Sequence, residues 1–215
     1  MKKRIYTVLF MVIITVVFIS GVALIYLLTR ESILTNESLL LKRSVLYAGG
    51  LYIGDEEDEI INVYAKNVEE RENDMVHYYI ITDPISDADE YGDLDVLSYV
   101  FHAKAPGLWG EIKALIGFNA CFGAITGVDF IEQNETPGLG ARISEKKFKE
   151  QFQGKMGPFT MVGEGEKDGN YEFDAITGAT VTSTAVEHML NYTITYVLPK
   201  VKKELTGTGE SDGKN

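Results

Sequence analysis

The feature that most constrains this chain is an uncharged, apolar run from Ile5 to Leu28, 24 residues long. At about 1.5 Å of rise per residue, a helix of this length reaches about 36 Å, which is enough to cross the hydrocarbon core of a bilayer with some tilt. A secretory signal peptide also has a basic start and an apolar run, but its apolar core is usually shorter, and no clear Ala-x-Ala cleavage site follows here. We therefore expect a retained, single-pass transmembrane helix.

The charges that flank this run predict its orientation. Basic residues occupy positions 2–4 before the run, whereas Arg30 is followed directly by Glu31 and then by Glu37. The positive-inside rule then places the N-terminus in the cytoplasm. We expect the remainder of the chain to lie outside the cytoplasm, anchored to the inner (plasma) membrane.

Composition narrows the class of the remaining chain. A hydrophobic content of 45% is too high for a disordered chain, and 215 residues suffice for one domain of ordinary size plus an anchor. The formal net charge of −12 repels phosphate backbones and argues against a nucleic-acid partner.

The single cysteine, Cys121, excludes a disulfide within the chain, and its apolar neighbours predict burial. His77, His102 and His188 lack the spacing of a known metal motif, so we expect no metal site.

Changes in residue pattern divide the chain into four regions. We expect an anchor helix over residues 1–30, a helical and charged linker over 31–75, a folded domain over 76–205 and a flexible tail over 206–215. The tail contains mainly Gly, Ser, Thr, Lys and acidic residues, which cannot build a core.

The folded domain is predicted to be α+β, with a mixed and largely antiparallel sheet flanked by helices, preceded by the single N-terminal transmembrane helix. Short apolar and β-branched runs between Asp, Pro and Gly residues predict strands at Val76–Thr82, Val96–Phe101, Glu111–Phe118, Ala124–Ile131 and Phe159–Val162. Ser144–Phe152 predicts a short helix capped by Ser144, and Thr184–Lys203 a longer one that Pro199 ends or kinks.

One segment combines small residues and hydroxyls between a strand-like and a helix-like run. It reads Asp174-Ala-Ile-Thr-Gly-Ala-Thr180-Val-Thr-Ser183. Gly178 and Ala179 let the backbone approach a ligand closely, and a helix that begins near Thr182 directs free N–H groups at an anion. The simpler alternative is that Thr182 or Ser183 only caps a helix. The segment is neither a Walker A loop nor a GxGxxG loop.

A second segment, Asn134-Glu-Thr-Pro-Gly-Leu-Gly-Ala141, predicts a turn. Pro137-Gly138 favours a turn with a residue of positive φ, and Gly140 permits a second close approach of the backbone. Amides in this turn would be able to face the polar edge of a bound ligand. An ordinary surface turn is the alternative that the residues alone leave open.

Together these two segments resemble the FMN-binding domain shared by the G subunit of Rnf complexes and the C subunit of Na⁺-translocating NADH:quinone reductases. Asp174 to Thr180 is similar to that family's Asp-x-x-Ser/Thr-Gly-Ala-Thr flavinylation motif, and Glu135 to Gly140 to its Glu-Thr-Pro-Gly-Leu-Gly loop. Gly107-Leu-Trp-Gly110 is also similar to the family. The resemblance covers roughly residues 105–198.

The resemblance implies that Thr180 carries FMN through a phosphoester, as a phosphothreonyl-FMN tether rather than a catalyst, within a domain that spans 76–205. The further residues that it places at the flavin are Asp174, Thr177, Gly178, Ala179, Thr182, Glu135, Thr136, Pro137, Gly138, Leu139 and Gly140. Neutralising Glu135 is expected to shift the flavin potential, whereas Asp55 and Glu56 should matter little. No catalytic residue and no metal ligand is implied.

The implied function is that of a membrane-anchored electron-transfer subunit with covalent FMN, in an ion-translocating (Na⁺ or H⁺) oxidoreductase complex of the Rnf/Nqr type. The short chain favours the Rnf G subunit, and the chain would have no complete active site of its own. Implied partners are the other membrane subunits and an FAD-dependent, Mg²⁺-dependent FMN transferase that recognises Asp174. The alternatives are a stand-alone anchored FMN carrier and an anchored binding module without redox activity. A Ser or Thr hydrolase is disfavoured because G-x-S-x-G is absent.

Overall fold

A computed structural model describes residues 2–51, 54, 56–72, 76–83 and 95–205 of the chain. The chain forms two compact units, Met1–Leu40 and Leu41–Asn215. The expected tail, 206–215, lies outside the described residues, and so does Asp55. The division of the chain after residues 30, 75 and 205 stays a prediction.

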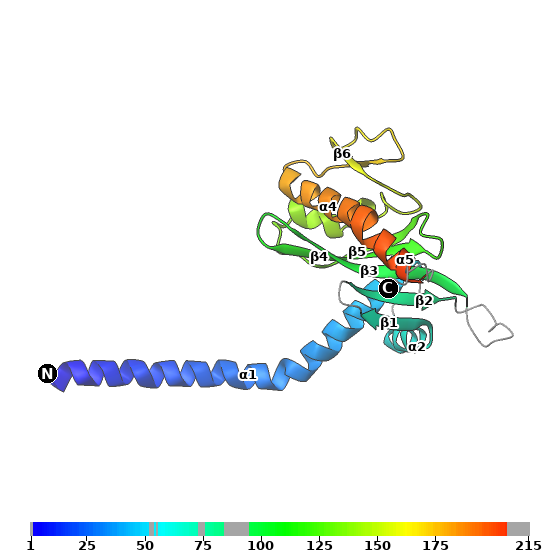
Figure 1. The fold of residues 1–215 in the computed structure, drawn as a ribbon. Coiled ribbons are helices and arrows are strands. Elements are labelled where there is room, and N and C mark those ends of the chain that lie inside the picture. The colour runs from blue at the N-terminus through cyan, green and yellow to red at the C-terminus, as the bar shows by residue number, and fades with distance from the viewer. Residues whose placement is uncertain (1, 52–53, 55, 73–75, 84–94, 206–215) are drawn as a thin grey trace, which may run out of the picture. The chain divides into compact units, whose positions relative to one another are not determined.

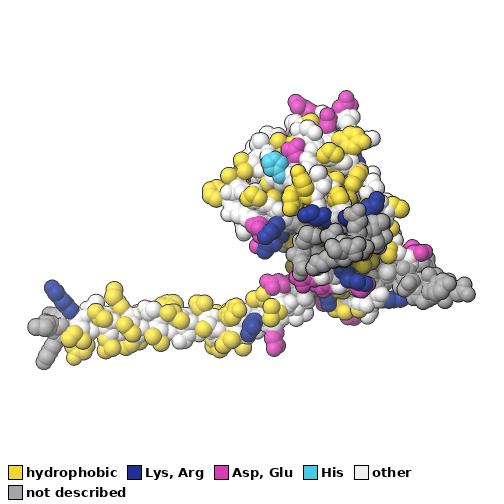
Figure 2. Space-filling model, in the orientation of Figure 1, with side chains coloured by type: hydrophobic (Ala, Val, Ile, Leu, Met, Phe, Trp, Pro, Cys, Tyr) yellow, Lys and Arg dark blue, Asp and Glu magenta, His cyan; other side chains and the backbone are white. Residues whose placement is uncertain are grey.

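Helix α1 runs without a break from Lys2 to Ala48 and confirms the expected helix of membrane-spanning length. Exposed apolar residues follow one another along most of this helix from Ile5 to Leu28, as Figure 2 shows for the visible face, and Phe18 and Leu28 are 70% and 74% exposed. The Thr15 hydroxyl donates to the Met11 carbonyl at 2.8 Å, which satisfies this polar group inside the helix. An apolar surface around the whole circumference suits lipid as the surrounding medium.

The second unit is built on a five-stranded antiparallel meander, which confirms the α+β prediction (Figure 1). Its strands, in sequence and spatial order, are β1 (Val68–Glu72), β2 (His77–Thr82), β3 (Val96–Pro106), β4 (Glu111–Asn119) and β5 (Ile125–Glu132). Two further strands, β6 (Thr160–Val162) and β7 (Glu172–Asp174), form a small parallel pair. Sequential antiparallel pairing needs only short connections, and the β3–β4 turn is among the shortest of these.

Strand β1 lies in the segment that was expected to be a charged linker. Its sequence, Val-Glu-Glu-Arg-Glu, has only Val68 as an apolar residue, and the four charged residues are exposed. Charged side chains on an outer strand prevent pairing with other chains, so an edge strand lacks the apolar alternation by which strands are found. Strand β7 corresponds to the strand-like run that was expected directly before the Asp174–Ser183 segment.

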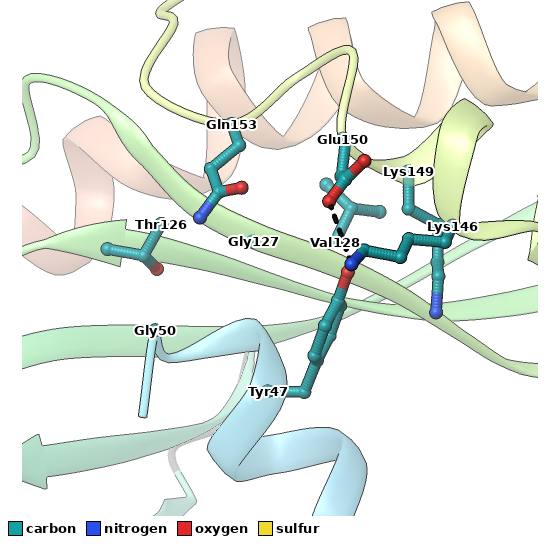
Figure 3. A pocket seen from close by; sticks show the side chains of 9 residues that line it. All are labelled: Tyr47, Gly50, Thr126, Gly127, Val128, Lys146, Lys149, Glu150 and Gln153. Atoms are coloured by element: carbon teal, nitrogen blue, oxygen red, sulfur yellow. Dashed lines mark ion pairs between the residues drawn. The ribbon is translucent and has the colours of Figure 1, made fainter. Parts of the chain in front are cut away.

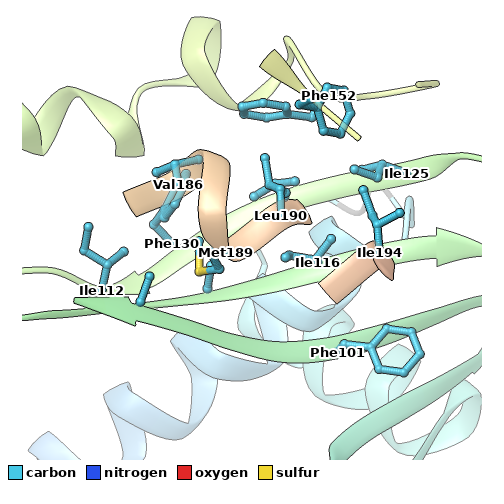
Figure 4. Close-up of a cluster of buried hydrophobic side chains, with 14 of the residues drawn as sticks. Phe101, Ile112, Ile116, Ile125, Phe130, Phe152, Val186, Met189, Leu190 and Ile194 are labelled. Atoms are coloured by element: carbon cyan, nitrogen blue, oxygen red, sulfur yellow. The ribbon is translucent and has the colours of Figure 1, made fainter. Parts of the chain in front are cut away.

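Both faces of the sheet are covered. Helix α4 (Thr180–Tyr192) crosses one face, where Phe101, Ile116 and Leu190 belong to the main core (Figure 4). Helix α2 (Glu57–Asn67) and the end of α1 cover the other face, where Val45 belongs to a smaller cluster with Val100. Adjacent residues on β3, such as Val100 and Phe101, thus point into different cores, as the alternation of a strand requires.

The last turn of α1 lies directly on the sheet of the second unit. Thr126 donates its hydroxyl to the Ala48 carbonyl at 2.6 Å, and Ser98 donates to the Gly49 carbonyl at 2.7 Å. A Cβ atom at Gly117 would lie only 1.9 Å from the Ala48 carbonyl oxygen, so this contact requires glycine. The helix end is therefore part of the fold of the second unit.

The other helices differ in their bounds from the sequence prediction. A 3₁₀ turn, η1 (Gly140–Ser144), precedes the four-residue helix α3 (Lys146–Lys149), so Ser144 ends a turn and does not cap a helix. Helix α4 begins at Thr180, before the predicted start. It continues through a π-helical turn, η2 (Thr193–Val197), into α5 (Leu198–Leu205). Pro199 is tolerated because the wider π turn before it changes the hydrogen-bond register of the helix.

Candidate functional site

The Asp174–Ser183 motif connects the end of β7 to the start of α4. Asp174 is the last residue of β7, and Thr180 is the first residue of α4. Between them Gly178 has a φ of +77°, a left-handed conformation that glycine adopts without strain. The turn thus brings the exposed Thr180 side chain to the N-terminus of α4, a helix with one buried face.

The Glu135 carboxylate holds this helix start to two other segments. Oε2 of Glu135 accepts the Thr182 hydroxyl at 2.5 Å, and both groups are buried. Oε1 accepts the backbone N–H groups of Leu108, at 2.9 Å, and Trp109, at 3.1 Å, in the β3–β4 turn. One buried side chain therefore links the β3–β4 turn, the loop after β5 and the first turn of α4.

Glycines leave the space that this arrangement needs. A Cβ atom at Gly140 would lie 2.6 Å from the Thr182 hydroxyl, and one at Gly107 would lie 2.6 Å from a Glu135 carboxylate oxygen. Gly138 has a φ of +75°, as predicted for the turn after Pro137. The loop and the motif, which are far apart in sequence, are brought together: Gly178 lies beside the Leu139 side chain.

The N-terminus of α4 has no side-chain cap. Ala179 occupies the N-cap position with extended φ of −130°, and its side chain makes no capping hydrogen bond. Helix α4 therefore presents free N–H groups and the positive end of its dipole at Thr180. This is the arrangement in which helix N-termini bind phosphate groups.

A network of carboxylates fixes the backbone before Thr180. Oδ1 of Asp174 accepts the N–H groups of Gly165 and Lys167, each at 3.0 Å. Glu164 accepts the Thr177 N–H at 3.0 Å and an Arg142 guanidinium N–H at 3.0 Å. The Arg142 hydrogen bond and the Thr177 donors lower the pKa of Glu164 to about 2, so this carboxylate is ionised at neutral pH.

Exposed apolar side chains surround the Thr180 position. Leu108 and Trp109 at the tip of the β3–β4 turn are 57% and 68% exposed, Leu139 is 42% exposed and Val181 is 52% exposed. An open groove of about 280 Å³ between the end of β3 and α4 is lined by Pro106, Thr180 and Val181 among others. Large apolar side chains that stay exposed near one another are typical of a binding surface.

The structure assigns different surroundings to the residues expected at the flavin. Thr180, Thr177, Gly178, Thr136, Pro137, Gly138 and Leu139 are exposed, whereas Ala179, Thr182, Glu135 and Gly140 are buried and Asp174 is half-buried. The hydroxyl of Thr136 accepts the Trp109 indole N–H at 3.1 Å. Thr182 and Glu135 therefore hold the site in place from buried positions, and Asp174 orders the loop between β6 and β7.

Sequence reasoning did not find Glu164, Arg142 or Gln151. Gln151 exchanges two hydrogen bonds with the Asp174 backbone, at 2.8 Å and 3.3 Å. No motif marks these side chains, because their partners are distant in sequence.

Cys121 corrects another expectation. Its side chain is exposed, because it lies in the β4–β5 turn and not in a strand.

A second hollow, of about 180 Å³, lies beside Tyr47 (Figure 3). Its two lysines are already paired: Lys146 with Glu150 at 3.6 Å and Lys149 with Asp129 at 2.8 Å. These ion pairs leave neither lysine charge free to attract a ligand.

Among the described residues, no group of three or more His, Cys, Asp or Glu side chains is placed to hold a metal ion.

Comparison with known proteins agrees with this geometry. The model of a family described as the FMN-binding domain matches residues 107–195, from the β3–β4 turn to η2. The FMN-binding domain thus contains both the Glu135 loop and Thr180, while β1, β2 and β3 precede the matched residues.

Curated relatives are components of ion-translocating complexes. The chain is 43% identical over 90 residues to the G subunit of the Na⁺-translocating ferredoxin:NAD⁺ oxidoreductase complex of Acetobacterium woodii, covering 41% of this chain and 42% of the relative. It is 34% identical over 135 residues to the G subunit of the ion-translocating oxidoreductase complex of Methanosarcina acetivorans, covering 63% and 65%. The chain thus spans less than two thirds of the length of these relatives.

A solved structure shows the same fold. The C subunit of the Na⁺-translocating NADH-quinone reductase from Parabacteroides distasonis superposes with a TM-score of 0.61 at 24% identity, over 78% of this chain and 94% of that one. The corresponding subunit from Vibrio anguillarum is 31% identical over 94 residues, covering 40% of this chain and 37% of the relative.

The residues of the site fit FMN. A phosphate fits the uncapped start of α4, and the exposed apolar side chains of the β3–β4 turn, of Leu139 and of Val181 fit a planar ring system. Gly178 and Gly138 allow the two loops to approach such a ring closely. The chemistry of these residues thus matches both the phosphate and the ring of FMN.

Proposed function

We propose that FMN is bound covalently to Thr180 through a phosphoester, and that the chain is an electron-carrying subunit of an ion-translocating oxidoreductase complex of the Rnf/Nqr type. The observation that carries the proposal is the free hydroxyl of Thr180 at the uncapped N-terminus of α4. When bound, FMN supplies the redox chemistry, since a flavin accepts and releases electrons singly. The following contacts support the choice of Thr180.

The other hydroxyls of the motif are already engaged. Thr182 donates to Glu135, and the Ser183 hydroxyl accepts the Ile176 N–H at 3.0 Å and donates to the Ala179 carbonyl at 3.1 Å. Thr177 bonds Glu164 through its hydroxyl as well as its N–H. The Thr180 hydroxyl has no partner within the described part of the chain, and its side chain is exposed.

Electrostatics favour a phosphate on Thr180. An Ala at the N-cap leaves unsatisfied N–H groups and costs a helix about 1 kcal/mol relative to Ser, Thr, Asp or Asn. Phosphate oxygens are strong acceptors, and the helix dipole is worth about 0.3–1 kcal/mol for an anion at an exposed terminus. A phosphoester at Thr180 would supply the cap that the sequence lacks.

The proposed roles of the other site residues follow from their contacts. Trp109, Leu139 and Val181 would contact the ring, and amides of the Pro137–Ala141 loop would face its polar edge. Glu135 and Thr182 hold these elements in place. Asp174 shapes the loop that an FAD-dependent FMN transferase would recognise during maturation.

We propose a complex of the Rnf type, with the chain as its G subunit. Support comes from the relatives in Acetobacterium woodii and Methanosarcina acetivorans, both of which are named as G subunits. Helix α1 would anchor the chain in the plasma membrane with its N-terminus in the cytoplasm, as the basic residues at positions 2–4 predict. The flavin would then cycle outside the cytoplasm, and a covalent bond would prevent its loss.

Denaturing gel electrophoresis tests the covalent bond. The chain is co-expressed with a flavin transferase, and flavin fluorescence is read in the gel. We expect a fluorescent band for the wild type and for Thr195→Val, an exposed threonine of η2, and at least a tenfold weaker band for Thr180→Val. A band of full intensity for Thr180→Val, or no band for the wild type, would overturn the proposal.

A further inference from the structure

A separate cavity of about 490 Å³ lies between the C-terminal helices and the ends of β2, β3 and β4. It shares no lining residue with the groove beside Thr180. Its volume lies in the range of small-molecule sites, which are typically about 300–1,000 Å³. The proposed attachment of FMN makes no use of this cavity.

The helical wall presents two aromatic rings. Tyr192 and Tyr196 are 60% and 57% exposed, and their ring centroids lie 5.3 Å apart at an interplanar angle of 34°. Tyr196 belongs to the π-helical turn η2, a rare conformation that occurs often at functional sites. Two neighbouring tyrosine rings that remain exposed offer a surface on which a planar ring can pack.

The strand wall contains a second aromatic pair. The rings of His77 and His102 are stacked, with centroids 4.5 Å apart and planes at 9°. Each ring is held by one polar partner: His77 by Glu70 at 2.6 Å and His102 by the Tyr79 hydroxyl at 3.0 Å. The cavity thus has fixed aromatic groups on both walls.

The charge of the lining is opposite to that of the chain. Lys104, Lys113 and Lys200 line the cavity and no Asp or Glu among the described residues does, although the chain has a net charge of −12. Glu111 lies 3.5 Å from Lys104 and Glu132 lies 2.6 Å from Lys113. Lys200 makes no ion pair with any residue that the structure describes, so its charge is available to an anion.

We infer that this cavity binds a small planar aromatic anion, a fused ring system that carries a carboxylate or phosphate group. The ring packs against Tyr192 and Tyr196, and the anionic group pairs with Lys200, which follows Tyr196 by four residues and so lies one helical turn further along. This site is independent of Thr180. A chain that cannot carry FMN therefore binds the anion equally well.

Methyl NMR tests the inference on the full-length chain in detergent. Of the six methionines, Met189 lines the cavity, whereas Met156 and Met161 do not. The chain is labelled with ¹³C at its methionine methyl groups, the Met189 signal is assigned with Met189→Leu, and 2-naphthoate is titrated as the probe. We expect a saturable shift of the Met189 signal without a matching shift of Met156, in the wild type and in Thr180→Val alike.

Two comparisons test the anionic group. Replacing 2-naphthoate by its neutral amide, or Lys200 by Gln, is expected to weaken binding by about fivefold or more, as for the loss of a charge-assisted hydrogen bond. Lys66→Gln removes the same charge from an exposed position on α2 and should change nothing. The inference fails if Met189 does not shift, if the amide binds as tightly as the acid, or if Lys66→Gln weakens binding as much as Lys200→Gln.

Discussion

At the scale of single residues, Glu135 determines how the three segments of the proposed FMN site meet. Its carboxylate accepts two backbone N–H groups and one hydroxyl in a buried position. A buried donor that loses its acceptor costs about 1–3 kcal/mol. Glu135→Ala is therefore expected to lower the free energy of unfolding by about 3 kcal/mol, measured by urea denaturation in detergent.

Glu135→Gln separates shape from charge. Glutamine keeps an oxygen for the two amides, and its NH₂ group can donate to the Thr182 hydroxyl, so we expect a loss of about 1 kcal/mol. Glu56→Gln, an exposed control just before α2, should change stability by less than about 0.5 kcal/mol. Equal stability of Glu135→Ala and Glu56→Gln would contradict the structural role. The expected effect of Glu135 on the flavin potential stays a prediction, which Glu135→Gln tests with the fold retained.

At the scale of elements, the β6–β7 loop is fastened to the turn before α4 through Glu164. The pKa of Glu164 is lowered from its ordinary value of 4.5 to about 2. Between these two pH values the folded chain therefore binds fewer protons than the unfolded chain. The stability from this contact is therefore complete above pH 4.5 and is lost as the pH falls toward 2. We expect the Thr177 amide proton, which bonds this carboxylate, to change its NMR shift with a midpoint near 2.

Two variants control this measurement. Glu164→Gln should abolish the titration of the Thr177 signal, while Glu166→Gln, an exposed carboxylate of the same loop, should leave it unchanged. A midpoint near 4.5 in the wild type would show that Arg142 and Thr177 do not hold the carboxylate as the structure indicates.

The same elements show what the sequence could predict. Short apolar and β-branched runs located β2 to β5 because each strand has buried positions, and small residues located the turn at Gly178. Strand β1 was missed because an exposed edge strand has no such apolar run. The contact between Glu135 and Thr182 spans 47 positions, and Glu164 acts on a backbone N–H, so neither leaves a local pattern. The resemblance supplied the candidate residues of the site, whereas their division into exposed and supporting groups required the structure.

At the scale of the whole molecule, the charges beside α1 predict the side of the membrane on which the folded domain lies. Cys121 provides a direct test, because it is the single cysteine of the chain and its side chain is exposed in the β4–β5 turn. With the N-terminus in the cytoplasm and one membrane-spanning helix, the domain lies outside. We expect a membrane-impermeant fluorescent maleimide to label Cys121 in intact spheroplasts.

Cys121→Ser should abolish the labelling, and this loss would show that the maleimide reacts with Cys121 alone. Labelling should be as strong in intact as in lysed spheroplasts, since the domain is already accessible. Label that appears only after lysis would place the domain in the cytoplasm, and the flavin would then exchange electrons with cytoplasmic partners. Replacing the basic residues at positions 2–4 by Gln removes the charges that set the orientation, so it should reduce labelling of intact spheroplasts and leave that of lysed ones unchanged.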